Sequence, residues 1–361
     1  MDIRIGDFKA GQNHIDAVTD VIKSGRITEG PKVAELEKVM AKYLGVKNAI
    51  LVTNGTIALQ LVSLYLRNKN KHDELNVMVP ALTFPATINA FSSSGHPVGL
   101  CDIGEDLQMN IDTLSKTDKQ LTNIVVPVHL MGYTADMTHI MSEAKKYDWT
   151  VIEDACEAFG AEHDGKKVGT IGDFGCFSFY VSHNITAGEL GMIVTNNNEA
   201  AKVLRSMKNH GRVGSGMLFN HEYVGYNAKT TEFSAALGLE NMKDVDTSLK
   251  IRKDNCKYFF DNIKNDKLSP YPVTEGFSPL GYPIGCKTEG LKNSVCELLN
   301  LAGIETRGIF PCLANQPCYK DFEHLKLPVA NRIEKTVFYI GCHQYLSQED
   351  KDRIIDVLNK V

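Results

Sequence analysis

His183 is the side chain of this sequence best suited to moving a proton near neutral pH. An imidazole has an ordinary pKa of about 6.5, so it can both accept and donate a proton there. It lies in the stretch FSFYVSHNITAGELGMI, five residues after Ser178, whose hydroxyl could bind a phosphate. A lone histidine in an apolar context is more often structural than catalytic, and Ser178 is equally typical of an alternating strand. The motifs around this stretch therefore decide the interpretation.

A carboxylate pair, Glu153 and Asp154, follows the apolar run TVI, and Glu157 comes three residues after Asp154. Parallel sheets bind their ligands at the carboxyl ends of strands. A carboxylate there can keep the nitrogen of a heteroaromatic ring protonated, which makes the ring an electron sink. Acidic residues at the start of a helix would explain the same pattern equally well.

The turn Asn54, Gly55, Thr56 joins an apolar run at 49–52 to an amphipathic segment at 57–66. Exposed backbone N–H groups and the helix dipole make such a turn a binding site for phosphate, although a plain turn capped by Thr56 is the commoner explanation. Phe84, in PALTFPAT, could stack on a flat cofactor ring or lie in the core.

The elements that must position these residues alternate between strands and helices. Apolar runs without polar alternation indicate buried parallel strands at 49–52, 77–80, 124–130 and 150–155. The helical patterns lie at 14–23, 31–43, 57–66, 85–95, 137–147, 198–209, 231–263, 291–303 and 348–358. We expect an α/β protein with a large cofactor-binding domain over 1–240 and a small C-terminal domain over 241–361, connected by one long helix at 231–263.

The composition is that of an ordinary globular protein, with 361 residues, 43% hydrophobic and 23% charged. The net charge of -5 argues against nucleic acid or an anionic membrane as a partner. No run is long enough to span a bilayer, so we expect a cytoplasmic protein. The nine cysteines form no C-x-C or C-x-x-C motif, which favours reduced thiols and no metal site.

Several segments together resemble the DegT/DnrJ/EryC1/StrS family of pyridoxal-phosphate sugar aminotransferases. They are NGTIAL, VPALTFPAT, VIEDACEAFGAEHDGKKVGTIGDFGCFSF, NHGR, GYNAKTTEFSAALGLENM and ETRGIFPCLANQP, and they occur in the family's order. The resemblance implies the aspartate aminotransferase (type I) fold, with a mostly parallel seven-stranded sheet and a small C-terminal α/β domain. It also implies a homodimer with shared active sites and pyridoxal 5'-phosphate or pyridoxamine 5'-phosphate as the cofactor.

The same resemblance implies roles for individual residues. Gly55, Thr56 and Ser178 match the phosphate-binding positions, and Phe84 matches the ring-stacking position. Asp154 matches the partner of the pyridine nitrogen.

Two further positions complete the implied cofactor site. Glu157 lies near the ring hydroxyl, where glutamine is usual in the aminotransferases, and Asn227 matches the asparagine that reaches the phosphate across the dimer. His210 and Arg307 are candidates for substrate binding, although a structural loop histidine and a solvated arginine explain them about equally well.

Position 183 departs from the aminotransferase pattern, which has a lysine that forms a Schiff base with the cofactor. Histidine cannot form that bond. The pair Ser182 and His183 is similar to the one in the GDP-4-keto-6-deoxymannose 3-dehydratase branch of the family, and Glu157 also fits that branch. Leu190 is a second departure, at a position where the family usually has glycine.

The branch implies a 3-dehydratase that removes the 3-hydroxyl of a nucleotide-linked 4-keto-6-deoxy sugar, with His183 as acid and base. Pyridoxamine phosphate would be regenerated from glutamate, in a deoxysugar pathway for a surface polysaccharide such as the lipopolysaccharide O-antigen. The close cysteine pair of the related iron–sulfur CDP-sugar enzyme is absent from this sequence. The residues alone leave three functions open: this dehydratase, a nucleotide-sugar aminotransferase or its lysine-to-histidine variant, and an idle relative that binds cofactor or sugar nucleotide for regulation.

Overall fold

A seven-stranded sheet forms the centre of the protein in a computed structural model that describes residues 2–70, 74–214 and 220–361. The strand order is β1-β9-β8-β5-β4-β2-β3. Strand β9 runs antiparallel to both of its neighbours, and the other pairings in the sheet are parallel. The predicted mostly parallel α/β sheet is therefore confirmed. Its strands are β1 (Asn48–Val52), β2 (Val77–Pro80), β3 (Val98–Cys101), β4 (Ile124–Val125), β5 (Thr150–Asp154), β8 (Phe174–Ser178) and β9 (Gly191–Thr195).

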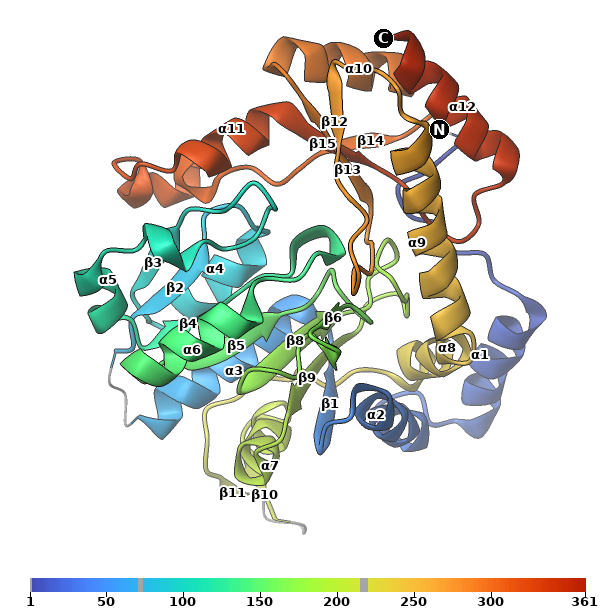
Figure 1. Ribbon diagram of the computed structural model, residues 1–361. Coiled ribbons are helices and arrows are strands. Elements are labelled where there is room, and N and C mark those ends of the chain that lie inside the picture. Colours follow the sequence, from blue (N-terminus) through green and yellow to red (C-terminus); the bar gives the residue numbers. More distant parts are fainter. Residues whose placement is uncertain (1, 71–73, 215–219) are drawn as a thin grey trace.

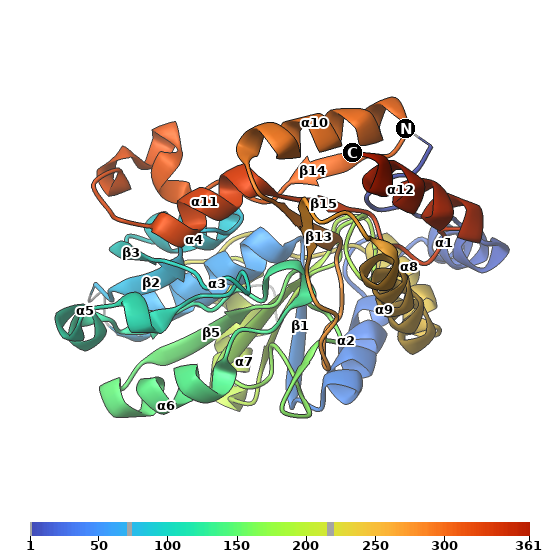
Figure 2. The same ribbon diagram turned by 45° about the horizontal axis from the view of Figure 1, so that its top comes forward.

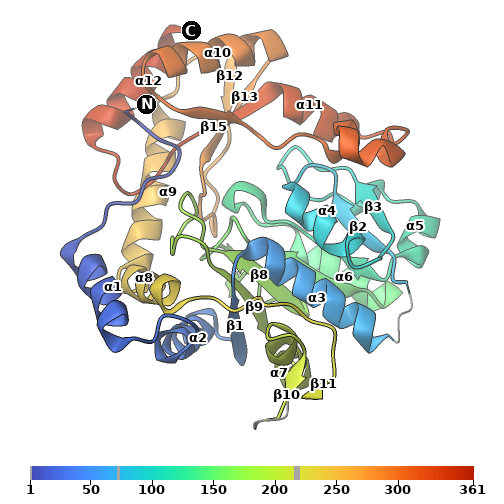
Figure 3. The ribbon, with the colours of Figure 1, turned by 180° about the vertical axis from the view of Figure 1, so that it is seen from behind.

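Helices cover both faces of this sheet, with α3 on one face and α6 on the other (Figures 1 and 3). Two glycines in left-handed conformation, Gly25 and Gly45, end the first two helices, as C-cap glycines commonly do. The helices up to residue 207 are α1 (Gln12–Ser24), α2 (Pro31–Leu44), α3 (Gly55–Lys69), α4 (Pro85–Ser92), α5 (Lys116–Leu121), α6 (Met137–Tyr147) and α7 (Asn198–Met207). Short elements between them are η1 (Ile111–Thr113), η2 (Leu130–Gly132), β6 (Glu162–His163), β7 (Lys166–Lys167), β10 (Arg212–Val213) and β11 (Asn220–His221).

A second, antiparallel sheet of four strands lies above the carboxyl ends of the first (Figures 1 and 2). Its order is β12 (Leu268–Pro270), β13 (Tyr282–Cys286), β15 (Val337–Ile340) and β14 (Thr306–Gly308). The elements packed around it are α10 (Glu289–Leu301), η3 (Leu313–Asn315), η4 (Pro317–Phe322), α11 (Pro328–Thr336) and α12 (Gln348–Lys360). One continuous hydrophobic cluster joins the two sheets, since it includes Ile50 and Ile152 of the first with Tyr282 and Phe338 of the second.

Two predicted elements differ in the structure. The single helix expected over 231–263 is wrong, because the chain forms α8 (Glu232–Met242) and α9 (Val245–Asn262). Asp244 adopts a non-helical backbone (φ −116°, ψ 21°) and starts α9 in a new direction. The strand expected over 124–130 is shorter, because Pro127 has no N–H to donate and only Val128 pairs again, in an isolated bridge to Asp154.

Glu153 is a structural member of the predicted acidic pair. Strand alternation turns it away from Asp154, and its side chain is fully buried. One carboxylate oxygen accepts from His129 Nε2 at 3.0 Å. The remaining donors are the backbone N–H groups of Gly169, Ile171 and Gly172, each at 2.7 Å. Glu153 therefore fixes the 169–172 loop, and through it the position of β8.

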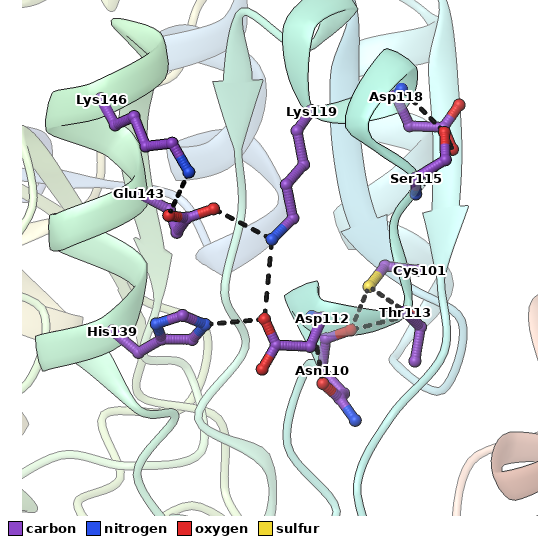
Figure 4. A network of polar contacts seen from close by, with 10 residues as sticks. All are labelled: Cys101, Asn110, Asp112, Thr113, Ser115, Asp118, Lys119, His139, Glu143 and Lys146. Carbon is purple, nitrogen blue, oxygen red and sulfur yellow. Dashed lines mark hydrogen bonds and ion pairs between the residues drawn. The ribbon is translucent and has the colours of Figure 1, made fainter.

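A surface network connects α5, α6 and η1 on the far edge of the sheet (Figure 4). Lys119 Nζ lies 2.9 Å from Glu143 and 3.6 Å from Asp112, and His139 also contacts Asp112 at 2.9 Å. Within the described residues, no helix combines the length and the apolar composition needed to cross a bilayer.

We predict that Glu153→Gln lowers the free energy of unfolding by about 3 kcal/mol, because the amide NH₂ would face donors that need an acceptor. Urea denaturation of the protein without cofactor measures this change. Glu162→Gln is the matched control, since Glu162 lies on the surface beside Lys167 and should change stability by at most about 0.5 kcal/mol. Equal stability of the two variants would contradict the structural role of Glu153.

Candidate active site

A cavity of about 350 Å³ opens at the carboxyl ends of β5 and β8, below the second sheet. Eight of the ten predicted site residues line it: Gly55, Thr56, Phe84, Asp154, Glu157, Ser178, His183 and Arg307. They come from the start of α3, the residue before α4, the end of β5 and the turn after it, the end of β8 and the loop after it, and β14. The structure therefore gathers residues separated by up to 252 positions in the sequence, from Gly55 to Arg307, around one space.

The start of α3 provides an anion site at one end of the cavity. Asn54 Oδ1 caps the helix by accepting from Ile57 N at 3.0 Å, so the cap is Asn54 and not Thr56. The first N–H groups of a helix have no partner within the helix and point toward its N-terminal end. A Cβ on Gly55 would lie 2.8 Å from Cys156 Sγ and 2.9 Å from Ser178 Cβ, so only glycine allows this approach.

Asp154 forms the floor of the cavity and is almost fully buried. Its Oδ2 accepts from Thr87 Oγ1 at 2.8 Å, and its Oδ1 accepts from Cys156 N at 3.2 Å. No helix follows it within 155–161, so the alternative explanation as helix N-terminal charge is wrong. These contacts hold a carboxylate in place to accept a hydrogen bond from a protonated ring nitrogen, whose charged form it stabilises.

Glu157 lies beside Asp154 and is also buried. Its Oε2 accepts from Met131 N at 2.8 Å, in the turn formed by η2. Burial raises the pKa of Glu157 to about 8, and the charge of Asp154 acts in the same direction. Glu157 is therefore mostly protonated at neutral pH and can donate a hydrogen bond.

His183 is half-buried in the wall of the cavity. Its Nδ1 lies 3.2 Å from the carbonyl oxygen of Ser178, which can only accept, so Nδ1 carries the hydrogen and Nε2 is left as an acceptor. Burial lowers the pKa of His183 to about 4, partly opposed by the Ser178 hydrogen bond and supported by the charge of Arg252. The imidazole is therefore neutral near pH 7. Among the described residues that line the cavity, no lysine is present.

The second sheet closes the cavity from above. Arg307 points its guanidinium at Glu305 Oε1, 2.9 Å from Nη2, and Glu305 in turn accepts from Ile5 N. Phe84 is 56% exposed, which excludes the alternative of a core phenylalanine, and its ring lies 5.6 Å from that of Phe310.

Two predicted residues lie outside the cavity. The backbone N–H of His210 donates to Tyr226 O at 3.0 Å, and Asn227 pairs with Asn209 in an isolated β-bridge. The single chain therefore does not bring Asn227 to the phosphate end, and the role predicted for it depends on a second subunit.

The leucine at position 190 fits the loop without disturbing it. Leu190 is buried and its carbonyl accepts from Phe179 N at 2.8 Å. The glycine that the geometry requires is Gly191, where a Cβ would lie 2.2 Å from the Asn54 carbonyl.

Sequence reasoning missed several residues of the cavity. Thr87, which binds Asp154 although it does not itself line the cavity, could have been found, because it lies within the motif that contains Phe84. Tyr339 and Phe310 carry no local signal, since only the packing of β15 and the segment after β14 brings them to the cavity.

The described residues fit pyridoxal phosphate or pyridoxamine phosphate. The start of α3 and Ser178 suit the phosphate, Asp154 suits a protonated ring nitrogen, and Phe84 offers an exposed ring face. Across the described parts of the chain, no three histidine, cysteine or carboxylate side chains are arranged to hold a metal ion. Fold and site together define a pyridoxal-phosphate enzyme of the aspartate aminotransferase type.

Comparison with known proteins identifies the family. Residues 9–359 match the model of the DegT/DnrJ/EryC1/StrS aminotransferase family, so the chain belongs to it and the predicted family is confirmed. GDP-perosamine synthase of Caulobacter vibrioides is 33% identical over 92% of this chain and 90% of its own length.

Two solved structures are similar along the whole chain. PseC of Helicobacter pylori, an aminotransferase of pseudoaminic acid biosynthesis, has a TM-score of 0.94 at 24% identity, covering 100% of this chain and 99% of its own; it supports the fold. GDP-4-keto-6-deoxymannose-3-dehydratase (ColD), as a histidine-to-asparagine mutant with bound GDP-perosamine, has a TM-score of 0.90 at 27% identity, covering 99% of this chain and 100% of its own.

The raised pKa of Glu157 predicts a specific dependence of stability on pH. The folded protein holds this proton more tightly than the unfolded chain, whose glutamate has a pKa of about 4.5. The stabilisation is therefore complete below pH 4.5 and is lost as the pH rises to about 8.

We predict that Glu157→Gln removes this pH-dependent loss of folding stability, which in the wild-type protein is on the order of a few kcal/mol between pH 5 and pH 8. Unfolding of the cofactor-free protein at the two pH values measures it, with the exposed Glu323→Gln as control. A wild-type protein and a Glu157→Gln variant that lose the same stability between the two pH values would show that Glu157 ionises normally.

Proposed function

We propose that this protein is a pyridoxamine-phosphate-dependent 3-dehydratase that acts on a nucleotide-linked 4-keto-6-deoxy sugar of the GDP-4-keto-6-deoxymannose type. The observation that carries the proposal is a neutral His183 in the cavity wall, with no lysine among the described residues that line the cavity. Without such a lysine the cofactor is held by noncovalent contacts. The neutral imidazole of His183, whose Nε2 is free, is then available as the base of the dehydration.

Each predicted residue that lines the cavity has a part in this proposal. Bound pyridoxamine phosphate would supply an amine for the 4-keto group and an electron sink. Gly55, Thr56 and Ser178 would hold the phosphate, Phe84 would stack on the ring, and Asp154 would hold the proton on the ring nitrogen.

The acid and base groups differ in their protonation. Glu157 is protonated and donates toward the ring hydroxyl. His183 Nε2 would accept the proton of the cofactor C–H bond whose electrons expel the sugar 3-hydroxyl, and would then give that proton to the departing hydroxyl, which leaves as water.

The proposed substrate contacts and subunit assembly follow from the resemblance to the 3-dehydratase branch of the family. Arg307 would contact the phosphates of the nucleotide from β14. A homodimer would bring the partner subunit's Asn227 to the phosphate end and place His210 near the substrate, and glutamate would regenerate the amine. We place this enzyme in the cytoplasm, in deoxysugar biosynthesis for a lipopolysaccharide O-antigen, with a large domain over 1–240 and a small one over 241–361.

A nucleotide-sugar aminotransferase is the second candidate. The observation that favours it is the higher identity to GDP-perosamine synthase, 33%, than to the 3-dehydratase of Yersinia pseudotuberculosis, 27%. An imidazole could also return the proton to the sugar carbon. The remaining candidate, an idle regulatory relative, predicts binding without turnover, and the intact contacts of Asp154 count against it.

Incubation with GDP-4-keto-6-deoxymannose, pyridoxal phosphate and glutamate tests the proposal by product mass. We expect loss of water from the sugar, and we expect His183→Gln to reduce that rate by about 10²-fold or more, because it removes a general acid and base. The exposed His324→Gln is the matched control and should retain activity.

An amino sugar as the main product would favour the aminotransferase. Tight binding of the sugar nucleotide without any product would favour the idle relative. Either result would overturn the dehydratase proposal.

A further inference from the structure

Arg252 is a buried charge with only neutral partners among the described residues. It lies in α9, which runs from α8 at the first sheet to the second sheet beside β13 (Figures 1 and 2), and only 2% of its surface is exposed. Its guanidinium donates to Pro279 O at 3.0 Å, to Leu280 O at 2.8 Å and to Gln344 Oε1 at 3.2 Å. Burying a guanidinium without a carboxylate partner costs free energy, so the burial of Arg252 requires a structural or functional explanation.

Arg252 binds the backbone of the segment 278–280, which is itself fixed by further hydrogen bonds. Ser278 donates its N–H to Gly132 O at 3.1 Å and its hydroxyl to Phe159 O at 2.7 Å. Leu280 lines the active-site cavity and donates its N–H to Met131 O at 3.4 Å. A Cβ on Gly132 would lie 1.9 Å from Ser278 O, so the two segments are in close contact.

The loop that carries His183 and the turn that binds Glu157 both contact this segment. On one side, Met131, whose carbonyl accepts from Leu280, gives its own N–H to Glu157. On the other side, Asn184, the residue after His183, donates its amide NH₂ to Ser278 O and Pro279 O, both at 3.1 Å.

We propose that Arg252 is a positioning residue of the active site: by fixing the 278–280 segment, it sets the places of the His183 loop and of the turn that holds Glu157. The link to catalysis rests on the proposed role of His183, whereas the anchoring of the two loops does not.

A second geometric observation joins Arg252 to His183. Both side chains line a small cavity of about 20 Å³ behind the main one, together with Asn184 and Gln344. The positive charge of Arg252 therefore disfavours a second positive charge on the imidazole, and it lowers the pKa of His183 in addition to burial.

Other groups also face the two cavities beside His183. The charged ones besides Arg252 are Asp7, Asp154, Glu189 and Arg307, whereas Glu157 keeps its proton at neutral pH. The remaining titratable ones are Cys156, Tyr180, Tyr339 and Tyr345.

Two measurements on the cofactor-free, full-length protein test the proposal. Histidine-selective NMR, with the His183 signal assigned by its loss in His183→Gln, follows the titration of that ring. Amide hydrogen exchange follows the N–H groups of Ser278 and Leu280. We expect Arg252→Met to raise the His183 midpoint by roughly 0.5 to 1 pH unit and to speed exchange at the two amides about tenfold or more.

Arg252→Lys separates the two effects and also serves if the methionine variant does not fold. It keeps the charge but loses the fork of donors, so the His183 midpoint should stay near the wild-type value while exchange at Ser278 and Leu280 becomes faster. The matched control is Arg353→Met, which removes a contact to the carbonyl of Ala302 at the end of α10 and should change neither readout.

The proposal is overturned if exchange at Ser278 and Leu280 in Arg252→Lys equals that of the wild type, or if a folded Arg252→Met leaves the His183 midpoint unchanged. Neither measurement uses a substrate. An enzyme that proved to transfer an amino group would therefore refute the dehydratase proposal and leave the positioning of the two loops standing.

Discussion

The close approach of the α3 N-terminus to the ends of β8 and β9 is the constraint on which the active site depends. At this approach, a side chain on Gly55 or on Gly191 would collide with the neighbouring segment. This contact places unpaired helix N–H groups beside Ser178 and leaves room for an anion between them. Because Ser178 O also accepts from His183, the same approach sets the imidazole relative to the anion site.

The two neighbouring carboxylates of β5 show how one strand serves both fold and site. Glu153 faces the core, orders the 169–172 loop with three hydrogen bonds and accepts a fourth from His129, while Asp154 faces the cavity and is held by Thr87. Burial then separates the protonation of the remaining groups. Glu157 keeps its proton and His183 loses its own, so an acid and a base face one cavity at neutral pH.

The sequence allowed prediction of the parts of the site that are local in the chain. The turn at Gly55 and Thr56, the strand end at Asp154 and the histidine at 183 each lie within one short motif, and all line the cavity. The sheet was also predictable, because buried parallel strands are apolar throughout.

What the sequence did not reveal depends on contacts between distant segments. Arg252 looks like any helical arginine until its partners at 279 and 280 are known, and the placement of Tyr339 depends on the packing of the second sheet. The break at Asp244 was missed because residues 231–263 read as one continuous helix.

The central claim is that His183 occupies the position of the lysine that forms a Schiff base with the cofactor in the aminotransferases, so that this cavity holds its cofactor noncovalently. Borohydride reduction in the presence of pyridoxal phosphate, followed by peptide mass mapping, tests it most directly. We predict no cofactor adduct in the peptide that contains residue 183 of the wild-type protein, and an adduct at that position in His183→Lys. A stoichiometric cofactor adduct on any one lysine of the wild-type protein, or no adduct in a folded His183→Lys that binds pyridoxal phosphate, would contradict the claim.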